Sequence, residues 1–132
     1  MRPYALFLAP LLFGACATLE PVCPQGMQAM VSEQVFFGTD KPGGKVSPVE
    51  WADFVDRSVT PRFPQGLTVW PAQGQWRGEQ GKVVREPSYI LTLVHSGDAV
   101  ADAAVVALAK DYQQRFAQEA VLRVRSRACV SF

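Results

Sequence analysis

The sequence contains very little of the chemistry that metal sites and common catalytic motifs need. Its 132 residues include one histidine, His95, and three cysteines with no Cys-x-x-Cys spacing. A structural zinc site takes four ligands of these types, so we expect no metal and no bound cofactor. The segment around Gly78, Gly81 and Lys82 misses the spacing of a phosphate-binding loop, and no Gly-x-Ser-x-Gly motif occurs.

An excess of charge and a long apolar run are also missing. Lys and Arg total 13 and Asp and Glu total 12. Nucleic-acid-binding domains need a basic footprint, so this balance argues against nucleic acid as a partner. The longest apolar run, Tyr4 to Phe13, is shorter than the roughly 20 residues that a membrane-spanning helix needs.

The N-terminal segment has the pattern of a bacterial lipoprotein signal. Arg2 precedes the apolar run, and Phe13-Gly14-Ala15-Cys16 forms a small-residue cleavage site that ends in cysteine. We therefore predict a signal peptide over residues 1–15, lipid on Cys16 and membrane attachment through that lipid. An ordinary secretory signal cut nearby is the alternative. Ala17 follows in place of the aspartate that signals inner-membrane retention, so we expect the outer membrane, facing the periplasm.

The two remaining cysteines form an even pair. If Cys16 is lipidated, Cys23 and Cys129 are left in an oxidising compartment, where thiols pair. A disulfide between them is the simplest interpretation.

The rest of the chain divides into a tether over residues 16–30 and one α+β domain over residues 31–132. The first strand is expected over 31–38. Ser47, Pro48 and Glu50 form a capping box that starts a helix, and Pro61 ends it. Further strands are expected over 67–70 and 82–95, joined by a glycine turn, with a bulge or an edge at Pro87. A helix over 98–120 and a strand over 121–132 complete the chain.

This order predicts a ferredoxin-like βαββαβ sandwich, with a four-stranded antiparallel sheet and two helices on one face. In that topology the first strand lies between the third and the fourth. The start of the first strand and the end of the last then meet, which places Cys23 and Cys129 within reach of each other.

Several stretches resemble a known family. They are Val59 to Val69, Gly74 to Gly78, Arg85 to Ser88, and the ending Val121 to Phe132. Together they make residues 31–132 similar to DUF3574, a family of small exported bacterial proteins that are often lipoproteins. The resemblance implies the domain extent and an exported location, and it implies no activity.

The predicted hairpin carries candidate ligand-binding residues. Trp76 offers a stacking face, Arg77 and Arg85 offer forked donors for an anion, and Glu86 could orient either arginine. The structural alternative is an ion pair between Arg85 and Glu86, with Trp76 as a lid on the core. His95 is the one side chain suited to proton transfer near neutral pH, and it is a weak catalytic candidate. A surface or helix-capping histidine is the alternative.

The sheet has one face that the two helices cannot cover. Both faces of the strand 88–95 are apolar, so the open face is a possible homodimer interface. Arg123, Arg125 and Arg127 alternate along the last strand, and we expect them to make the open face partly cationic, which would favour a polar, monomeric sheet instead.

These features support two hypotheses about function. The leading one is a lipid-anchored cell-envelope protein whose domain is a non-catalytic binding or accessory module. The alternative is a small enzyme of the dimeric α+β barrel type, in which Arg77 or Arg85 holds an anionic small molecule and His95 moves a proton.

Overall fold

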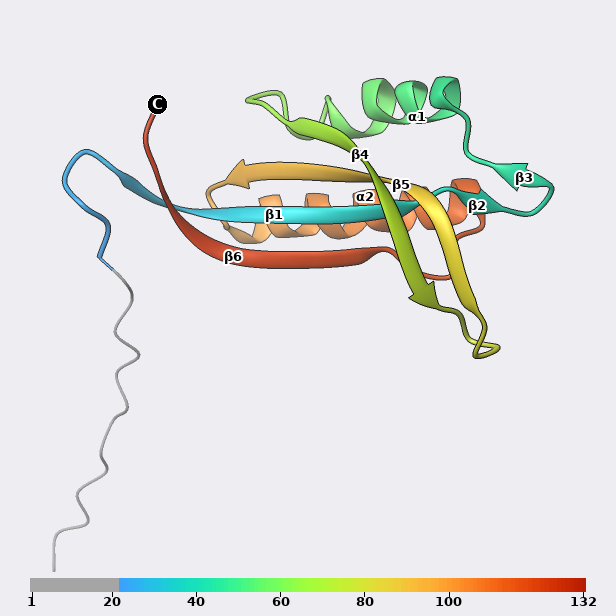
Figure 1. Ribbon diagram of the computed structural model, residues 1–132. Helices are drawn as coiled ribbons and strands as arrows, with labels where there is room; N and C mark the ends of the chain where they lie inside the picture. The colour runs from blue at the N-terminus through green and yellow to red at the C-terminus, as the bar shows by residue number, and fades with distance from the viewer. Residues whose placement is uncertain (1–21) are drawn as a thin grey trace, which may run out of the picture.

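A computed structural model of the protein describes residues 22–132 (Figure 1). The predicted signal peptide over 1–15, the lipidation site Cys16 and the tether residues up to Pro21 lie outside these residues. The elements follow in the order β1 (Gln28–Gly38), β2 (Asp40–Lys41), β3 (Gly44–Lys45), α1 (Pro48–Phe54), a π-helical turn (Val55–Val59), β4 (Thr68–Arg77), β5 (Val83–His95), α2 (Ala99–Phe116) and β6 (Leu122–Val130).

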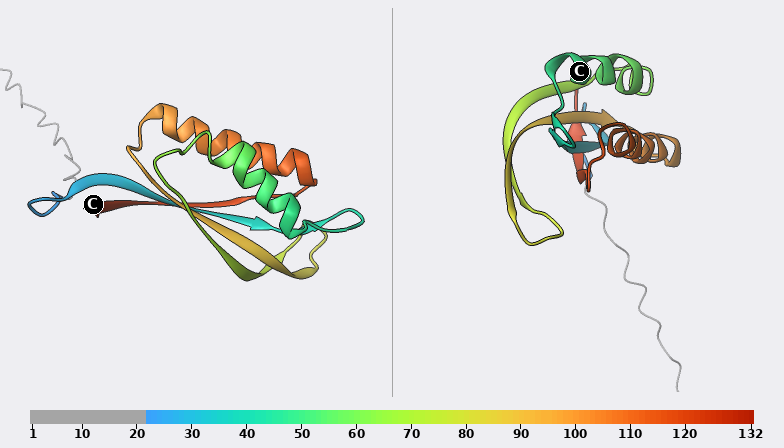
Figure 2. Two further views of the ribbon diagram at one scale, coloured as in Figure 1. Left: turned by 90° about the horizontal axis from the view of Figure 1, so that it is seen from above. Right: turned by 90° about the vertical axis from the view of Figure 1, so that its right-hand side faces the viewer.

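Four strands form one antiparallel sheet in the order β4-β5-β1-β6. Both helices lie on the same side of it, as Figure 2 shows. The predicted ferredoxin-like α+β fold is therefore confirmed, with β1 between β5 and β6. β1 begins at Gln28, inside the expected tether, because Gln28 to Met30 pair with the end of β6 and not with β5.

The core lies between the helices and one face of the sheet. Its aromatic centre is Phe37 of β1, which contacts Trp51 and Phe54 of α1 and Tyr112 of α2. The Tyr112 hydroxyl donates to the Gly38 carbonyl at 2.7 Å, and burial raises the pKa of this phenol above its usual value. Burial of this aromatic cluster is the main attraction that holds both helices on the sheet.

Local capping signals set the starts of both helices. Ser47 accepts a hydrogen bond from the Glu50 backbone N–H at 3.2 Å, and the Glu50 carboxylate accepts from the Ser47 N–H at 2.8 Å, which is the predicted capping box. Asp98 caps α2 by accepting from the Ala101 N–H at 2.8 Å. α2 ends at Phe116, earlier than expected, because Ala117 adopts a left-handed conformation with φ of 49°.

Pro87 causes no bulge, since the register between β4 and β5 is continuous from Thr68↔Thr92 to Arg77↔Val83. Pairing of β5 with β1 stops at Ser88. Pro87 therefore lies where β5 has a neighbour on one side only, which is the edge position where a missing N–H is tolerated. Beyond it the β4–β5 hairpin continues past the end of β1 and curves (Figure 2).

The faces of β6 differ from the expectation. Arg125 is the partner of Glu33 and Arg123 is the partner of Val35, both core-facing residues of β1. Directly opposed residues share a face, so Arg123, Arg125 and Arg127 lie on the helix side of the sheet. The prediction that they make the open face cationic is wrong. The alternation itself was clear, but it does not say which set of side chains faces the helices.

Candidate functional site

Glu86 is a buried carboxylate that fastens the hairpin to the end of β1. It is only 5% exposed, and it accepts from the Thr39 N–H at 2.7 Å, the Asp40 N–H at 2.5 Å and the Trp76 indole N–H at 3.0 Å. A Cβ at Gly38 would lie 2.5 Å from a Glu86 oxygen, so the close approach needs glycine at this position. These bonds occupy both carboxylate oxygens. Glu86 therefore binds two backbone N–H groups and the Trp76 indole, and not an arginine.

The four hairpin candidates do not form one cluster. Side chains alternate along a strand, so Trp76 and Glu86 share one face of the hairpin while Arg77 and Arg85 lie on the other. Arg85 donates to its cross-strand partner Gln75 at 2.8 Å. The expectation that Glu86 orients an arginine is wrong, and so is the alternative of an Arg85–Glu86 ion pair, because neighbouring residues of one strand point to opposite faces. Anion binding by Arg77 and Arg85 stays a prediction.

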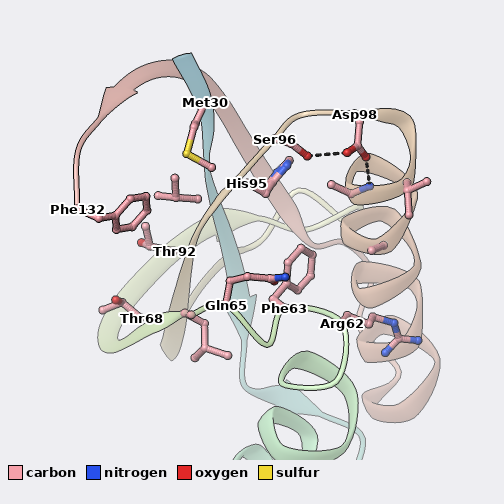
Figure 3. A pocket seen from close by; sticks show the side chains of 16 residues that line it. Met30, Arg62, Phe63, Gln65, Thr68, Thr92, His95, Ser96, Asp98 and Phe132 are labelled. Carbon is pink, nitrogen blue, oxygen red and sulfur yellow. Dashed lines mark hydrogen bonds between the residues drawn. The ribbon is translucent and has the colours of Figure 1, made fainter. Parts of the chain in front are cut away.

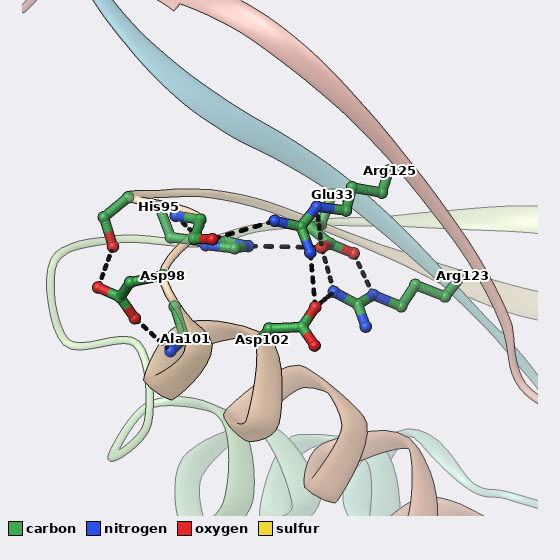
Figure 4. A network of polar contacts seen from close by, with 9 residues as sticks. Glu33, His95, Asp98, Ala101, Asp102, Arg123 and Arg125 are labelled. Atoms are coloured by element: carbon green, nitrogen blue, oxygen red, sulfur yellow. Dashed lines mark hydrogen bonds and ion pairs between the residues drawn. The ribbon is translucent and has the colours of Figure 1, made fainter. Parts of the chain in front are cut away.

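A second polar cluster lies between β6 and the start of α2 (Figure 4). Its centre is Glu33, a β1 carboxylate with 0% exposure. Arg123 donates hydrogen bonds from Nε and Nη2 to the two Glu33 oxygens. Its Nη2 also donates to Asp102 of α2 at 2.5 Å. Arg125 donates to the same Asp102 oxygen at 2.6 Å and lies 3.7 Å from Glu33. The cluster ties α2 to the edge of the sheet through paired charges.

His95 belongs to this cluster and is only 7% exposed. Its Nδ1 accepts the Gly97 N–H at 3.0 Å, so a neutral ring carries its proton on Nε2. Nε2 lies 3.5 Å from the Glu33 carboxylate and makes no hydrogen bond. The ring therefore spans a backbone amide and a buried carboxylate, which makes it neither a surface nor a helix-capping histidine.

Glu33 is the main residue that the sequence interpretation missed. It stands in the alternating strand Val31, Glu33, Val35, Phe37, where every other member is buried and apolar. A buried carboxylate at a core-facing position requires a partner of opposite charge, and Arg123 and Arg125 on β6 are such partners. A charged residue at an apolar, core-facing position was therefore the signal in the sequence that could have identified Glu33.

A groove of about 860 Å³ runs past His95 at the end of β5 (Figure 3). β4 begins at Thr68, opposite Thr92, so the last residues of β5 extend beyond β4. The groove has apolar walls from Phe63, Val94 and Phe132, and polar atoms from Thr92 and Ser96. The Thr92 hydroxyl has no hydrogen-bond partner. The buried ring of His95 offers little of its surface to this groove.

Acidic side chains in ion pairs and caps should make the fold acid-sensitive. A hydrogen bond from Lys41 holds the pKa of Glu50 at about 2, below its ordinary 4.5. Three aspartates also have pKa values below their ordinary 3.8. The largest cause of the lowered pKa is a hydrogen bond from Arg115 for Asp53, from the Ala101 N–H for Asp98, and from Arg123 for Asp102. Depressed carboxyl pKa values contribute stability above their unfolded-state values, and that stability is lost as pH falls through the folded-state values.

We therefore expect the thermal midpoint to fall steadily from about pH 4.5 to about pH 2, where these carboxylates become protonated. Differential scanning calorimetry across this range measures it. In the Glu50→Gln variant the decline should be shallower, because one depressed carboxyl is gone. A midpoint that stays constant between these pH values would show that the ion pairs contribute nothing.

Residues 22–132 hold no group of three or more potential metal ligands. Among the same residues, no helix combines the length and the hydropathy that a membrane span needs. The family relationship rests on sequence. The profile described as "Protein of unknown function (DUF3574)" matches residues 32–132. The chain belongs to this family. No curated protein matches the sequence of this DUF3574 chain.

Solved structures resemble the DUF3574 domain in fold. A phage SAM lyase in complex with S-methyl-5′-thioadenosine aligns with a TM-score of 0.61 at 16% identity, covering 87% of this chain and 97% of the lyase. CutA from Synechococcus elongatus aligns with a TM-score of 0.51 at 13% identity, covering 78% of this chain and 80% of CutA. At these identities the likeness establishes the α+β fold and nothing about chemistry.

Proposed function

We propose that this DUF3574 protein is a lipoprotein of the cell envelope, anchored through lipid on Cys16 in the outer membrane and facing the periplasm, and that its domain is a non-catalytic binding or accessory module. The lipoprotein signal at Phe13 to Cys16 motivates the anchor. An exported location agrees with the disulfide between Cys23 and Cys129, whose Cα atoms lie 5.5 Å apart, because such bonds persist in oxidising compartments.

One observation carries the non-catalytic part of the proposal: the side chains best suited to acid–base chemistry are committed to structural bonds. Glu86 accepts three hydrogen bonds, Glu33 accepts hydrogen bonds from Arg123, and His95 lies between the Gly97 N–H and Glu33. A general acid or base has to reach its substrate within hydrogen-bond distance. These three groups are 5%, 0% and 7% exposed, so the enzyme hypothesis lacks an accessible proton carrier among them.

Metabolic labelling with a radioactive or alkyne-bearing fatty acid tests the anchor. The wild-type protein should incorporate label and the Cys16→Ser variant should incorporate none, because the thioether that carries the lipid cannot form. Ala17→Ser is the matched control, since it changes the neighbouring position and keeps the cysteine. Equal labelling of the Cys16→Ser variant and the wild type would refute lipidation at this residue.

Membrane fractionation tests the location. Wild-type protein should sediment with the outer membrane, whereas Ala17→Asp should move to the inner membrane because it introduces the retention signal. Wild-type protein found in the soluble periplasmic fraction would contradict the anchor, whatever the domain binds.

A further inference from the structure

The open face of the sheet carries no charged side chain alongside β1, from Gln28 to Phe36 and the positions paired with them. In this part of the sheet the residues of the open face have even numbers and alternate with the core-facing ones. They are Gln28, Met30, Ser32, Gln34 and Phe36 of β1, Thr68 and Trp70 of β4, Ile90, Thr92 and Val94 of β5, and Leu122, Val124, Ser126, Ala128 and Val130 of β6. Glu86 has the same parity, but it lies in the hairpin beyond the end of β1, where its carboxylate is buried.

One row of this face is apolar across all four strands. Trp70 pairs with Ile90, Ile90 with Phe36, and Phe36 with Leu122. Trp70 is 49% exposed and Leu122 is 59% exposed, with Val124 beside the row at 44%. Large apolar side chains gathered on one face of a small domain mark an interaction surface.

The chain's own N-terminal segment is too short to reach this row, because the row crosses β1 at Phe36, about 23 Å along the strand from Ala29, the partner of the disulfide-bonded Cys129. In the mature form expected from the signal, six residues, Cys16 to Pro21, precede the described domain, and fully extended they reach about 20 Å. Leu19 is the one large apolar residue among them. The lipid on Cys16 would hold the far end of this segment at the membrane.

We propose that the open face binds a second copy of the same chain, forming a symmetric dimer in which two sheets pack face to face; this rests on the proposed anchoring. An uncharged face has no charge complementarity to offer a charged partner, whereas it meets its own copy without repulsion. The row next to the apolar one consists of Thr68, Thr92, Gln34 and Val124. Thr68 is exposed, and its hydroxyl and the Gln34 amide can each both donate and accept hydrogen bonds.

The size of the face suits such a dimer. Strands spaced about 4.8 Å apart and paired over about nine residues give a flat footprint of roughly 500 Å². Because side chains protrude from the sheet, the accessible surface of this face is larger than its flat footprint and approaches the about 800 Å² that each partner buries in a standard interface. Lipid anchoring adds a second advantage, because tethering all copies to one surface raises their effective concentration.

Site-specific crosslinking in intact envelopes tests the dimer. Gln34 lies near the centre of the open face, between Thr92 and Val124. A residue near the centre of a symmetric interface lies close to its own copy, whichever way the two-fold axis runs. We expect a short bismaleimide to convert full-length Gln34→Cys into a species of twice the mass, with roughly tenfold more product than Val106→Cys on the exposed surface of α2.

A charge placed on the same face provides the second variant. Leu122→Glu, at an exposed position that should tolerate it in the monomer, buries two carboxylates in the dimer and should weaken association roughly a hundredfold. Val106→Glu, exposed on α2, should leave association unchanged. Both effects are measured by sedimentation of the detergent-solubilised protein.

Two results would overturn the proposal: equal crosslinking of Gln34→Cys and Val106→Cys, or a wild-type sedimentation coefficient that matches the monomer and does not change in Leu122→Glu. These results are separable from failure of the anchor. A protein that incorporates fatty acid but sediments as a monomer refutes the dimer alone, whereas a protein without lipid refutes the anchor by itself.

Discussion

Replacing Arg123 with methionine should lower the free energy of unfolding by about 3–5 kcal/mol. The substitution keeps an apolar stem but removes both hydrogen bonds to Glu33, a carboxylate with 0% exposure. A buried carboxylate that loses its hydrogen-bonded partner costs far more than the pair contributes by itself, and Arg125, which remains 3.7 Å from Glu33, is too distant to replace the two lost hydrogen bonds. Urea denaturation followed by circular dichroism at neutral pH measures the change.

Arg57→Met is the matched control for this experiment. Arg57 pairs with Asp53 one helical turn away at 2.6 Å, with 78% of its own side chain exposed. Exposed pairs of this kind contribute less than about 1 kcal/mol. The double variant Glu33→Met with Arg123→Met should lose less stability than Arg123→Met alone, since it removes both charges. Equal losses from Arg123→Met and Arg57→Met would show that Glu33 does not depend on Arg123.

Removing the disulfide should cost a similar amount for a different reason. The bond between Cys23 and Cys129 spans a sequence separation of 106 residues. On the chain-entropy account, a crosslink of this length stabilises the fold by roughly 4–5 kcal/mol, because it restricts the unfolded chain. The double variant Cys23→Ala with Cys129→Ala should show this loss in urea denaturation.

Reduced wild-type protein is the control, because it lacks the same crosslink without a change of side chain. It should unfold at nearly the same urea concentration as the double variant. Small domains have a total stability of about 5–15 kcal/mol, so either form should be far less stable than the oxidised protein. If the oxidised wild type and the double variant unfold at the same midpoint, the bond makes no contribution to stability.

Local signals in the sequence were sufficient for the order of the four sheet strands and the two helices and for their topology, but not for the short strands β2 and β3. Ser47, Pro48 and Glu50 start α1 where expected, and the meeting of β1 with β6 brings Cys23 to Cys129. Both inferences depend on rules that act within a few residues or on the handedness of crossover connections. Such rules need no knowledge of how side chains pack.

The faces of the strands were harder to predict than the strands. The alternation in β6 separates Arg123 and Arg125 from Leu122 and Val124, but a period of two does not assign either set to the helices. Glu33 decides the question, since its buried carboxylate requires the arginines on its own side of the sheet. The apolar set is then exposed on the open face, which is the basis for the proposed dimer.

The hairpin candidates failed for a related reason. Trp76, Arg77, Arg85 and Glu86 are close in sequence across a turn, and proximity alone suggested one site. Alternation places Arg77 and Arg85 on the face opposite Trp76 and Glu86. The tie between Glu86 and the backbone of Thr39 and Asp40 spans more than forty residues of sequence, and no local pattern indicates such a contact.

The mass of the mature protein, measured after extraction from the envelope with free thiols alkylated, tests the central claim most directly. The account predicts a chain that begins at Cys16, carries lipid on that residue, and shows no alkylation because Cys23 and Cys129 are joined. A chain that begins at another residue without lipid, or one alkylated at both Cys23 and Cys129, would contradict it.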